Sequence, residues 1–118
     1  MFSKKALQNV KTIGKKIDFI QAIVEENGGV IKALEDEQNS RAAILMHLTS
    51  IAEQFDKLMQ NGELELLAYF EKQDIKGSYD LRTFIAHNYE GVDLYIVEDV
   101  INERLSVIKG NIKEILEK

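Results

Sequence analysis

The chain has no cysteine and no proline, and it contains only seven glycines among 118 residues. The absence of cysteine excludes disulfides, thiol nucleophiles and zinc–thiolate sites, and it suits a reducing compartment. The scarcity of proline and glycine leaves few positions that break regular structure. We therefore expect long, uninterrupted secondary-structure elements.

Long apolar runs are also missing. No segment approaches the roughly 20 apolar residues of a membrane span, and the first stretch, MFSKKALQNVKTIGKK, lacks the apolar run of a secretory signal. We expect a soluble, cytoplasmic protein without membrane contact, formed by a single domain over residues 1–118. The net charge of −5 argues against broad, non-specific binding to a nucleic-acid backbone, although it allows a local basic patch.

Apolar residues recur at steps of three and four, which is typical of amphipathic helices. These stripes predict a helix over about residues 4–26, ended by a glycine pair, and another over about residues 40–60 with Ser40 as its N-cap. Between them, VIKALED predicts a short helix. The segment ELELLAYFEKQDIKGS alternates apolar and polar residues, but no partner strand is visible. We expect a helical turn or two and a loop there.

The remaining third of the chain predicts two more helices. Asp80 is placed to cap a helix that Gly91 ends near Glu90, and Asp93 is placed to cap a long final helix that continues to Ile115. No alternating strand pattern remains. We predict an all-α fold, an up-and-down bundle of four to five helices.

The segment DLRTFIAHNYEG carries the most distinctive chemistry, with Arg82, His87 and Tyr89 within eight residues. On an ideal helix Arg82 and Tyr89 would lie within about 20° of each other, and His87 about 140° from Arg82. Arg82 and His87 therefore cannot point the same way on one straight helix. A second copy packed across a two-fold axis would still allow both residues to face one ligand.

These residue types suit RNA cleavage that needs no metal. Histidine exchanges protons near neutral pH, so His87 can assist attack by a ribose 2′-hydroxyl or protonate the leaving oxygen. Arginine offers a fixed charge and a planar fork of donors, so Arg82 can hold the phosphate. The alternative is that both are ordinary surface or interface residues, and their spacing alone does not decide between the two.

The motif has the form Arg, four residues, His, one residue, Tyr in RTFIAHNY, which resembles the signature of HepT toxins within the HEPN superfamily of small helical ribonucleases. The following EGVDLYIVEDVI resembles the continuation found in that family. ILMHLTSIAEQFDKL resembles its earlier helix, with Ile51-Ala52-Glu53 where Ile-Gly-Glu is usual. The similarity covers about residues 16–117.

The resemblance implies an all-helical homodimer in which Arg82 and His87 of both subunits line one cleft. It implies a prokaryotic ribonuclease toxin of a type II toxin–antitoxin pair that cuts tRNA or mRNA without a cofactor. It also implies a partner, an MntA-type nucleotidyltransferase antitoxin that attaches AMP to the motif tyrosine, here Tyr89.

The chain departs from the family pattern at two positions, with Thr83 and His47 where asparagine is frequent. Thr83 and Glu53 are expected to support the cleft, although Glu53 also fits a solvated carboxylate. His47 is expected on a helix surface or interface. Because His47 and His87 lie on different predicted helices without close companions, we expect no metal site.

Basic residues gather near the beginning of the chain, where Lys4, Lys11 and Lys15 share one helical face. They could steer RNA phosphates, or they could form an ordinary charged, solvated face. Two further functions remain open. One is a non-catalytic accessory subunit of a two-component nucleotidyltransferase, and the other is a plain helical dimerisation module.

Overall fold

The computed structural model describes residues 2–118, and all regular elements within them are helical. Met1, at the edge of the predicted domain, lies outside the described residues. The predicted all-α class is confirmed. The elements are α1 (Lys4–Glu26), α2 (Val30–Glu35), α3 (Ser40–Gln60), α4 (Leu64–Leu67), α5 (Lys72–His87), a 3₁₀ turn (Tyr89–Gly91), α6 (Leu94–Asp99), a π-helical segment (Val100–Arg104) and α7 (Leu105–Leu116).

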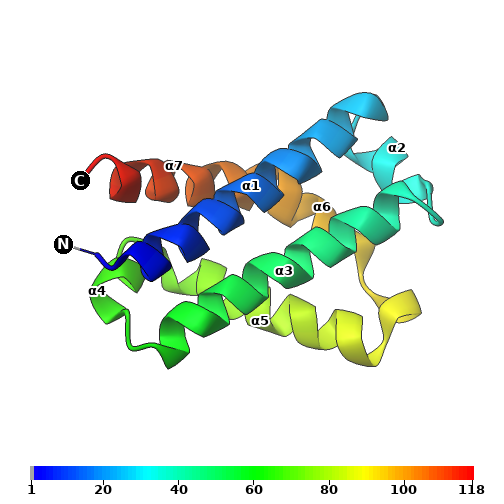
Figure 1. Ribbon diagram of the computed structural model, residues 1–118. Helices are drawn as coiled ribbons and strands as arrows, with labels where there is room; N and C mark the ends of the chain where they lie inside the picture. The colour runs from blue at the N-terminus through cyan, green and yellow to red at the C-terminus, as the bar shows by residue number, and fades with distance from the viewer. Residues whose placement is uncertain (1) are drawn as a thin grey trace.

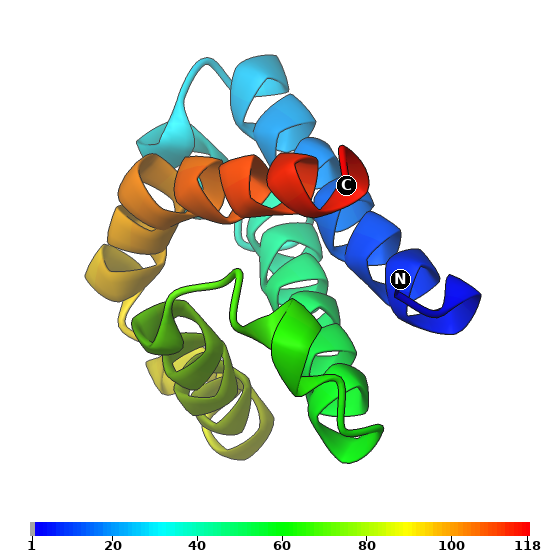
Figure 2. The ribbon, with the colours of Figure 1, turned by 90° about the vertical axis from the view of Figure 1, so that its left-hand side faces the viewer.

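The long elements run alternately in opposite directions along the bundle (Figure 1). α1, α3 and α5 are followed by α6, the π-helical segment and α7, which succeed one another without a break. In both views α3 lies between α1 and α5, and α7 lies against α1 (Figure 2). α5 therefore lies on one side of α3, whereas α1 lies on the other.

The core consists mainly of the predicted apolar stripes. Phe55 is fully buried and meets the ring of Phe70 edge to face, with ring centroids 5.0 Å apart. Burial of one such large side chain stabilises the fold by about 1.5–3 kcal/mol. The other fully buried side chains of α1 and α3 are Val10, Ile13, Ile17, Ile20, Ile44, Leu45, Ala52 and Leu58.

The predicted helix over residues 4–26 is confirmed by α1, and Gly28 follows it with a φ of 80°, a left-handed conformation that favours glycine. The predicted role of Ser40 as an N-cap is wrong. Asn39 occupies that position, and Ser40 is the first residue of α3. Its N–H and hydroxyl donate to the Asp36 carboxylate at 3.1 and 3.0 Å, and these hydrogen bonds lower the pKa of Asp36. Asp36 thus acts as the cap from outside the helix.

The boundaries of α5 differ from the prediction at both ends. The helix begins at Lys72 and ends at His87, so Asp80 lies inside it and pairs with Lys76 at 2.7 Å instead of capping it. The first turns of α5 include residues that were predicted to be loop, and Asp74 among them is buried against the π-helical segment. Its carboxylate accepts two hydrogen bonds from the Arg104 guanidinium, each 2.8 Å long. No local sequence pattern reveals this contact.

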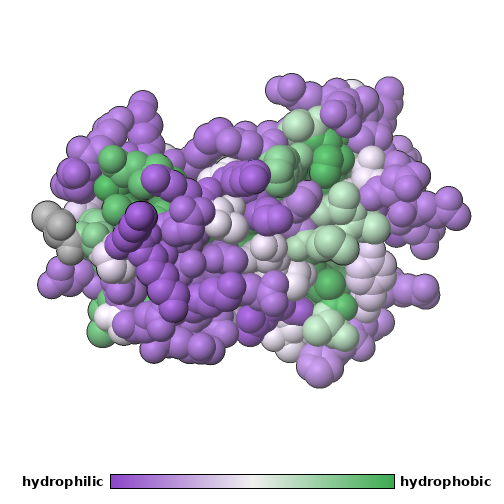
Figure 3. All heavy atoms as spheres, viewed as in Figure 1, coloured by the Kyte–Doolittle hydropathy of each residue, from purple (hydrophilic) through white to green (hydrophobic). Residues whose placement is uncertain are grey.

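The face of the molecule in Figure 3 is largely hydrophilic across its middle, with hydrophobic residues gathered towards its two ends. None of the helices in residues 2–118 combines the length and the apolar character needed to cross a bilayer.

Candidate functional site

Arg82 projects from α5 and is held by residues of α3 and of its own helix. Its Nη1 lies 3.9 Å from Oδ2 of Asp56, and its guanidinium carbon lies 5.2 Å from the centre of the Tyr79 ring. The Tyr79 hydroxyl donates to Oδ1 of Asp56 at 2.9 Å. Burial and this hydrogen bond raise the pKa of Tyr79. The three side chains therefore form a connected group with Arg82 at its solvent edge.

Asp56 and Tyr79 were missed by the sequence analysis, which expected Glu53 to support the cleft. Glu53 is exposed, and Asp56, three residues further along α3, is the carboxylate that meets Arg82. The position of Tyr79 could have been used, because it lies three residues before Arg82 and residues three apart on a helix are neighbours. Nothing in the local pattern distinguishes Asp56 from Glu53. The supporting role of Glu53 stays a prediction.

His87 is the last residue of α5 and is exposed to solvent. Because Arg82 and His87 both lie within the helix, the predicted divergence of about 140° between them applies. The two side chains leave α5 in different directions, so a single chain does not bring them to one point.

Tyr89 lies outside α5, and the prediction that it stands over Arg82 on the same helix is therefore wrong. Asn88 ends the helix with φ −153° and ψ 68°, and Tyr89 begins the 3₁₀ turn that follows. The Tyr89 side chain is 43% exposed. It is accessible to a modifying enzyme and lies two residues from His87.

The 3₁₀ turn is closed by Asn88 and Gly91. The Asn88 side-chain oxygen accepts a hydrogen bond from the Gly91 N–H at 3.2 Å, and the Asn88 main-chain oxygen accepts from the same N–H at 3.0 Å. A Cβ added at Gly91 would overlap the Asn88 carboxamide. Glycine at this position thus permits the turn that sets Tyr89 next to His87.

The other predicted residues occupy different surroundings. The Thr83 hydroxyl donates to the Tyr79 carbonyl at 3.0 Å, a bond within α5. His47 is half-buried, and its ring lies 5.2 Å from the ring of Phe19 in α1. Burial, and then the charge of Lys16, lower the pKa of His47. Since His47 and Asp56 are nine residues apart on α3, they point to opposite sides of that helix.

Within residues 2–118, no three His, Asp or Glu side chains are arranged so that they could hold a metal ion. The bonding partners of Arg82 are a carboxylate and an aromatic ring. The chemistry that the site itself offers is one imidazole for proton transfer and one guanidinium for binding an anion.

An apolar patch flanks the motif. We define it by two exposed side chains, Phe84 of α5 and Ile96 of α6, which line the same hollow. A hollow of about 340 Å³ between Phe84 and Ile96 opens in this patch. Tyr95 is 81% exposed and lines a separate hollow beside Ile31 and Leu34.

The charge around the motif is negative. Residues 80–103 contain six carboxylates but only one arginine, Arg82, and no lysine. One of these carboxylates, Asp80, is paired with Lys76 of the same helix. The other five form no ion pair among residues 2–118, so this segment of the chain is acidic.

Comparison with known families gives one result over most of the chain. The family model described as Ribonuclease HepT-like matches residues 13–115, which include both α3 and the whole motif. Searches of curated proteins and of solved structures give no significant match.

Proposed function

Because this chain belongs to the HepT-like ribonuclease family, we propose that it is the ribonuclease toxin of a type II toxin–antitoxin pair in the prokaryotic cytoplasm. The proposal is supported mainly by the contacts of Arg82 and the solvent exposure of His87. Arg82 is fixed by Asp56 and Tyr79, whereas His87 is exposed at the end of the same helix. A fixed cation and a free imidazole are the groups that metal-independent RNA cleavage requires.

In the proposed reaction His87 removes the proton from a ribose 2′-hydroxyl, and the 2′-oxygen attacks the adjacent phosphorus. The bond between phosphorus and the 5′-oxygen then breaks, and an imidazolium returns a proton to that oxygen. Arg82 stabilises the negative charge that develops on the phosphoryl oxygens. The products are a 2′,3′-cyclic phosphate and a free 5′-hydroxyl.

A homodimer would complete this site, because one chain directs Arg82 and His87 away from each other. The apolar patch beside the motif supports such an assembly. An aromatic side chain such as Phe84 buries about 150–250 Å² when it is covered. Packing of one patch on another would bring a second pair of motif residues near the first, and one histidine would act as base while the other acts as acid.

An MntA-type nucleotidyltransferase is the proposed antitoxin, and Tyr89 is the proposed site of its AMP transfer. The exposed hydroxyl of Tyr89 is the nucleophile in this step. It attacks the α-phosphorus of ATP, pyrophosphate leaves, and the phenolic proton passes to a base. The resulting adenylate places a negative charge two residues from His87, where it would repel a phosphate of the RNA.

The decisive experiment is incubation of the purified protein with tRNA and mRNA in the presence of a chelator. The parent protein should produce fragments with cyclic phosphate ends, and His87→Ala should lose this cleavage by a factor of about 10² or more while it keeps the helical fold. His47→Ala serves as the matched histidine control, because His47 packs against α1. Equal cleavage by His87→Ala and the parent would disprove the assignment.

The second candidate is a non-catalytic subunit that presents a nucleotidyltransferase with its substrate. The six carboxylates of residues 80–103 favour this function, since they oppose RNA at the motif. It predicts a stable complex and no RNA fragments from the parent protein. Intact mass after co-expression would test the tyrosine in both cases, because a mass increase of AMP should disappear in Tyr89→Phe.

A further inference from the structure

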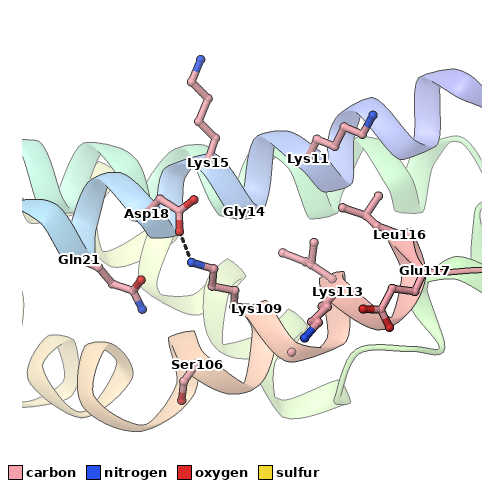
Figure 4. A pocket seen from close by; sticks show the side chains of 12 residues that line it. Lys11, Gly14, Lys15, Asp18, Gln21, Ser106, Lys109, Lys113, Leu116 and Glu117 are labelled. Atoms are coloured by element: carbon pink, nitrogen blue, oxygen red, sulfur yellow. Dashed lines mark hydrogen bonds and ion pairs between the residues drawn. The ribbon is translucent and has the colours of Figure 1, made fainter.

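The largest groove of the molecule lies between α1 and α7, away from the motif. It has a volume of about 680 Å³, and Figure 4 shows it between the two helices, bridged by the ion pair of Lys109 with Asp18. Gly14 of α1 faces Ile112 of α7, and a Cβ at Gly14 would lie 3.7 Å from the Ile112 side chain. Because Gly14 has no side chain, no atoms fill the groove at this position.

Four lysines line this groove, two from each helix. Lys11 and Lys15 belong to α1, and Lys109 and Lys113 belong to α7. Within each pair the residues are four apart, so their backbone positions are about 6 Å apart along the helix. The sequence indicates only that Lys11 and Lys15 share a helical face. It gives no sign that Lys109 and Lys113, nearly a hundred positions later, lie beside them.

Three of these lysines have no carboxylate partner. Among residues 2–118, only Lys109 of the four forms an ion pair, and Lys15 lies instead 5.7 Å from the centre of the Phe19 ring. Two carboxylates, those of Asp18 and Glu117, share the groove. The Lys15 ammonium points away from α7 (Figure 4), so the groove itself holds Lys11, Lys109 and Lys113 against two carboxylates. This is an excess of one positive charge in a chain whose net charge is −5.

The charges of the molecule are thus separated. The first 17 residues contain five lysines and no carboxylate, whereas residues 80–103 contain six carboxylates and one arginine. Both ribbon views place α1, which forms one wall of the groove, on the opposite side of α3 from α5 (Figures 1 and 2). A polyanion that has to reach Arg82 meets repulsion at the motif and attraction at the groove.

We propose that the lysine groove between α1 and α7 binds the phosphate backbone of the substrate RNA at a distance from the cleaved bond. This inference rests on the proposed function, because the RNA that it holds is the substrate. The lysines would act as point charges, so they would bind phosphates without selecting a base sequence. The groove would supply the attraction that the surroundings of Arg82 lack.

The dimensions of the molecule make the proposal depend on RNA length. The smallest extent of the chain is 20 Å. At about 3.4 Å per nucleotide along a stacked strand, a path across even this shortest dimension takes roughly six nucleotides. A dinucleotide at the motif cannot reach the groove, whereas a longer RNA can contact both regions.

The test uses a variant with Lys11→Gln, Lys15→Gln and Lys113→Gln together. Lys109 is left in place because its ion pair joins the two helices. Binding of a fluorescent single-stranded RNA, several times longer than the path, is measured in a His87→Ala background so that the RNA stays intact. The affinity should fall on the order of tenfold at low salt, and the dependence of log K on log salt should become shallower by about two.

A matched variant removes the same number of charges elsewhere, with Lys32→Gln, Lys57→Gln and Lys72→Gln. It should bind RNA nearly as well as the parent. In proteins that keep His87, the groove variant should show a raised KM for long RNA and an unchanged rate with a dinucleotide substrate.

Each other outcome has a defined meaning. Equal RNA binding by the groove variant and the control, or no RNA binding by any of the proteins, would overturn the inference. A groove variant that binds RNA normally but loses the nucleotidyltransferase would also overturn it, and would identify a protein-docking groove. If RNA binding depends on the groove but no protein cleaves RNA, the proposed function fails and the binding site stands.

Discussion

α3 and α5 are neighbouring helices of similar length, yet they are held in the bundle by different means. α3 buries eight of its 21 residues, nearly all of them apolar, whereas α5 buries only Asp74 and Leu81 of its 16. The core fixes α3 through many weak contacts. α5 contributes Leu81 to the core and packs Ile75 and Ile85 against it, and it also makes polar contacts to α3 and to the π-helical segment.

This difference matters because the candidate site is built on the less buried helix. A helix that buries little can present Arg82, Phe84 and His87 to solvent, but its position then depends on its anchors. The Asp74–Arg104 pair fixes its first half, and the hydrogen bond from Tyr79 to Asp56 fixes its second half. Substitutions in the core should therefore affect stability, and substitutions at the anchors should affect the site.

The largest effect is expected at the centre of the core. Phe55→Ala should lower the free energy of unfolding by about 3–5 kcal/mol, because it removes a fully buried ring and leaves a cavity. Urea denaturation measures the loss. Phe84→Ala is the control on α5, where the ring is 59% exposed, and it should change the unfolding free energy of the monomer by less than about 1 kcal/mol.

The two phenylalanine variants also separate stability from assembly. If the apolar patch forms the dimer contact, Phe84→Ala should weaken the dimer in sedimentation experiments although the monomer remains folded. Similar losses of unfolding free energy in the two variants would contradict the contrast between α3 and α5.

The next effect is expected at the buried anchor of α5. Asp74→Ala should destabilise the protein by about 3 kcal/mol, because it leaves the Arg104 charge without its main partner. The hydrogen bonds to Asp74 also raise the pKa of Arg104, so this residue cannot lose its charge to compensate. Hydrogen exchange should increase first in α5, and urea denaturation gives the total loss.

The exposed pair of Lys76 with Asp80 on the same helix is the matched control. Lys76→Ala should change the unfolding free energy by at most about 0.5 kcal/mol, the usual value for an exposed pair within a helix. Uniform faster exchange in all helices of Asp74→Ala would show that this anchor is not local to α5.

A smaller effect on stability and a clear effect on activity are expected at Asp56. Asp56→Asn should reduce kcat/KM for RNA by about tenfold, because Arg82 loses the charge that orients it. The unfolding free energy should change by less than about 1 kcal/mol, since both side chains are one-third exposed. Tyr79→Phe removes one hydrogen bond but keeps the carboxylate, so it should reduce activity less. A larger loss in Tyr79→Phe than in Asp56→Asn would argue against this ordering.

The smallest effect concerns His47 on the opposite side of α3. Its pKa is lowered in the folded state, mainly by burial, so the folded protein binds fewer protons than the unfolded chain near the ordinary histidine pKa. Its contribution to stability is therefore complete above a pH of about 6.5 and is lost as the pH falls through the lower folded value. The slope from this one group is at most about 1.4 kcal/mol per pH unit.

Urea denaturation of the parent and of His47→Gln at several pH values measures this contribution. Between pH 7 and 5 the free energy of unfolding should fall less in His47→Gln than in the parent. His87→Gln, which removes an exposed imidazole, is the control and should resemble the parent. The same pH dependence in the parent and in His47→Gln would show that His47 does not contribute.

The sequence predicted best where many residues repeat one signal. The helices over residues 4–26 and 40–60 follow from apolar stripes that run through their whole length, and the resemblance to the family is confirmed over residues 13–115. The roles of Arg82, His87 and Tyr89 stay predictions. The prediction failed at the beginning of α5, which has a weak stripe. There the helix is fixed by Asp74 and Arg104, which are 30 residues apart in the chain.

The sequence alone therefore determined the helical class, the two core helices and the residues of the motif, because neighbours along the chain carry that information. Only the tertiary structure decided that Asp56 meets Arg82, that Tyr89 lies outside the helix and that lysines of α1 and α7 share a groove. These features depend on contacts between residues far apart in the chain, and such contacts exist only when the bundle has packed.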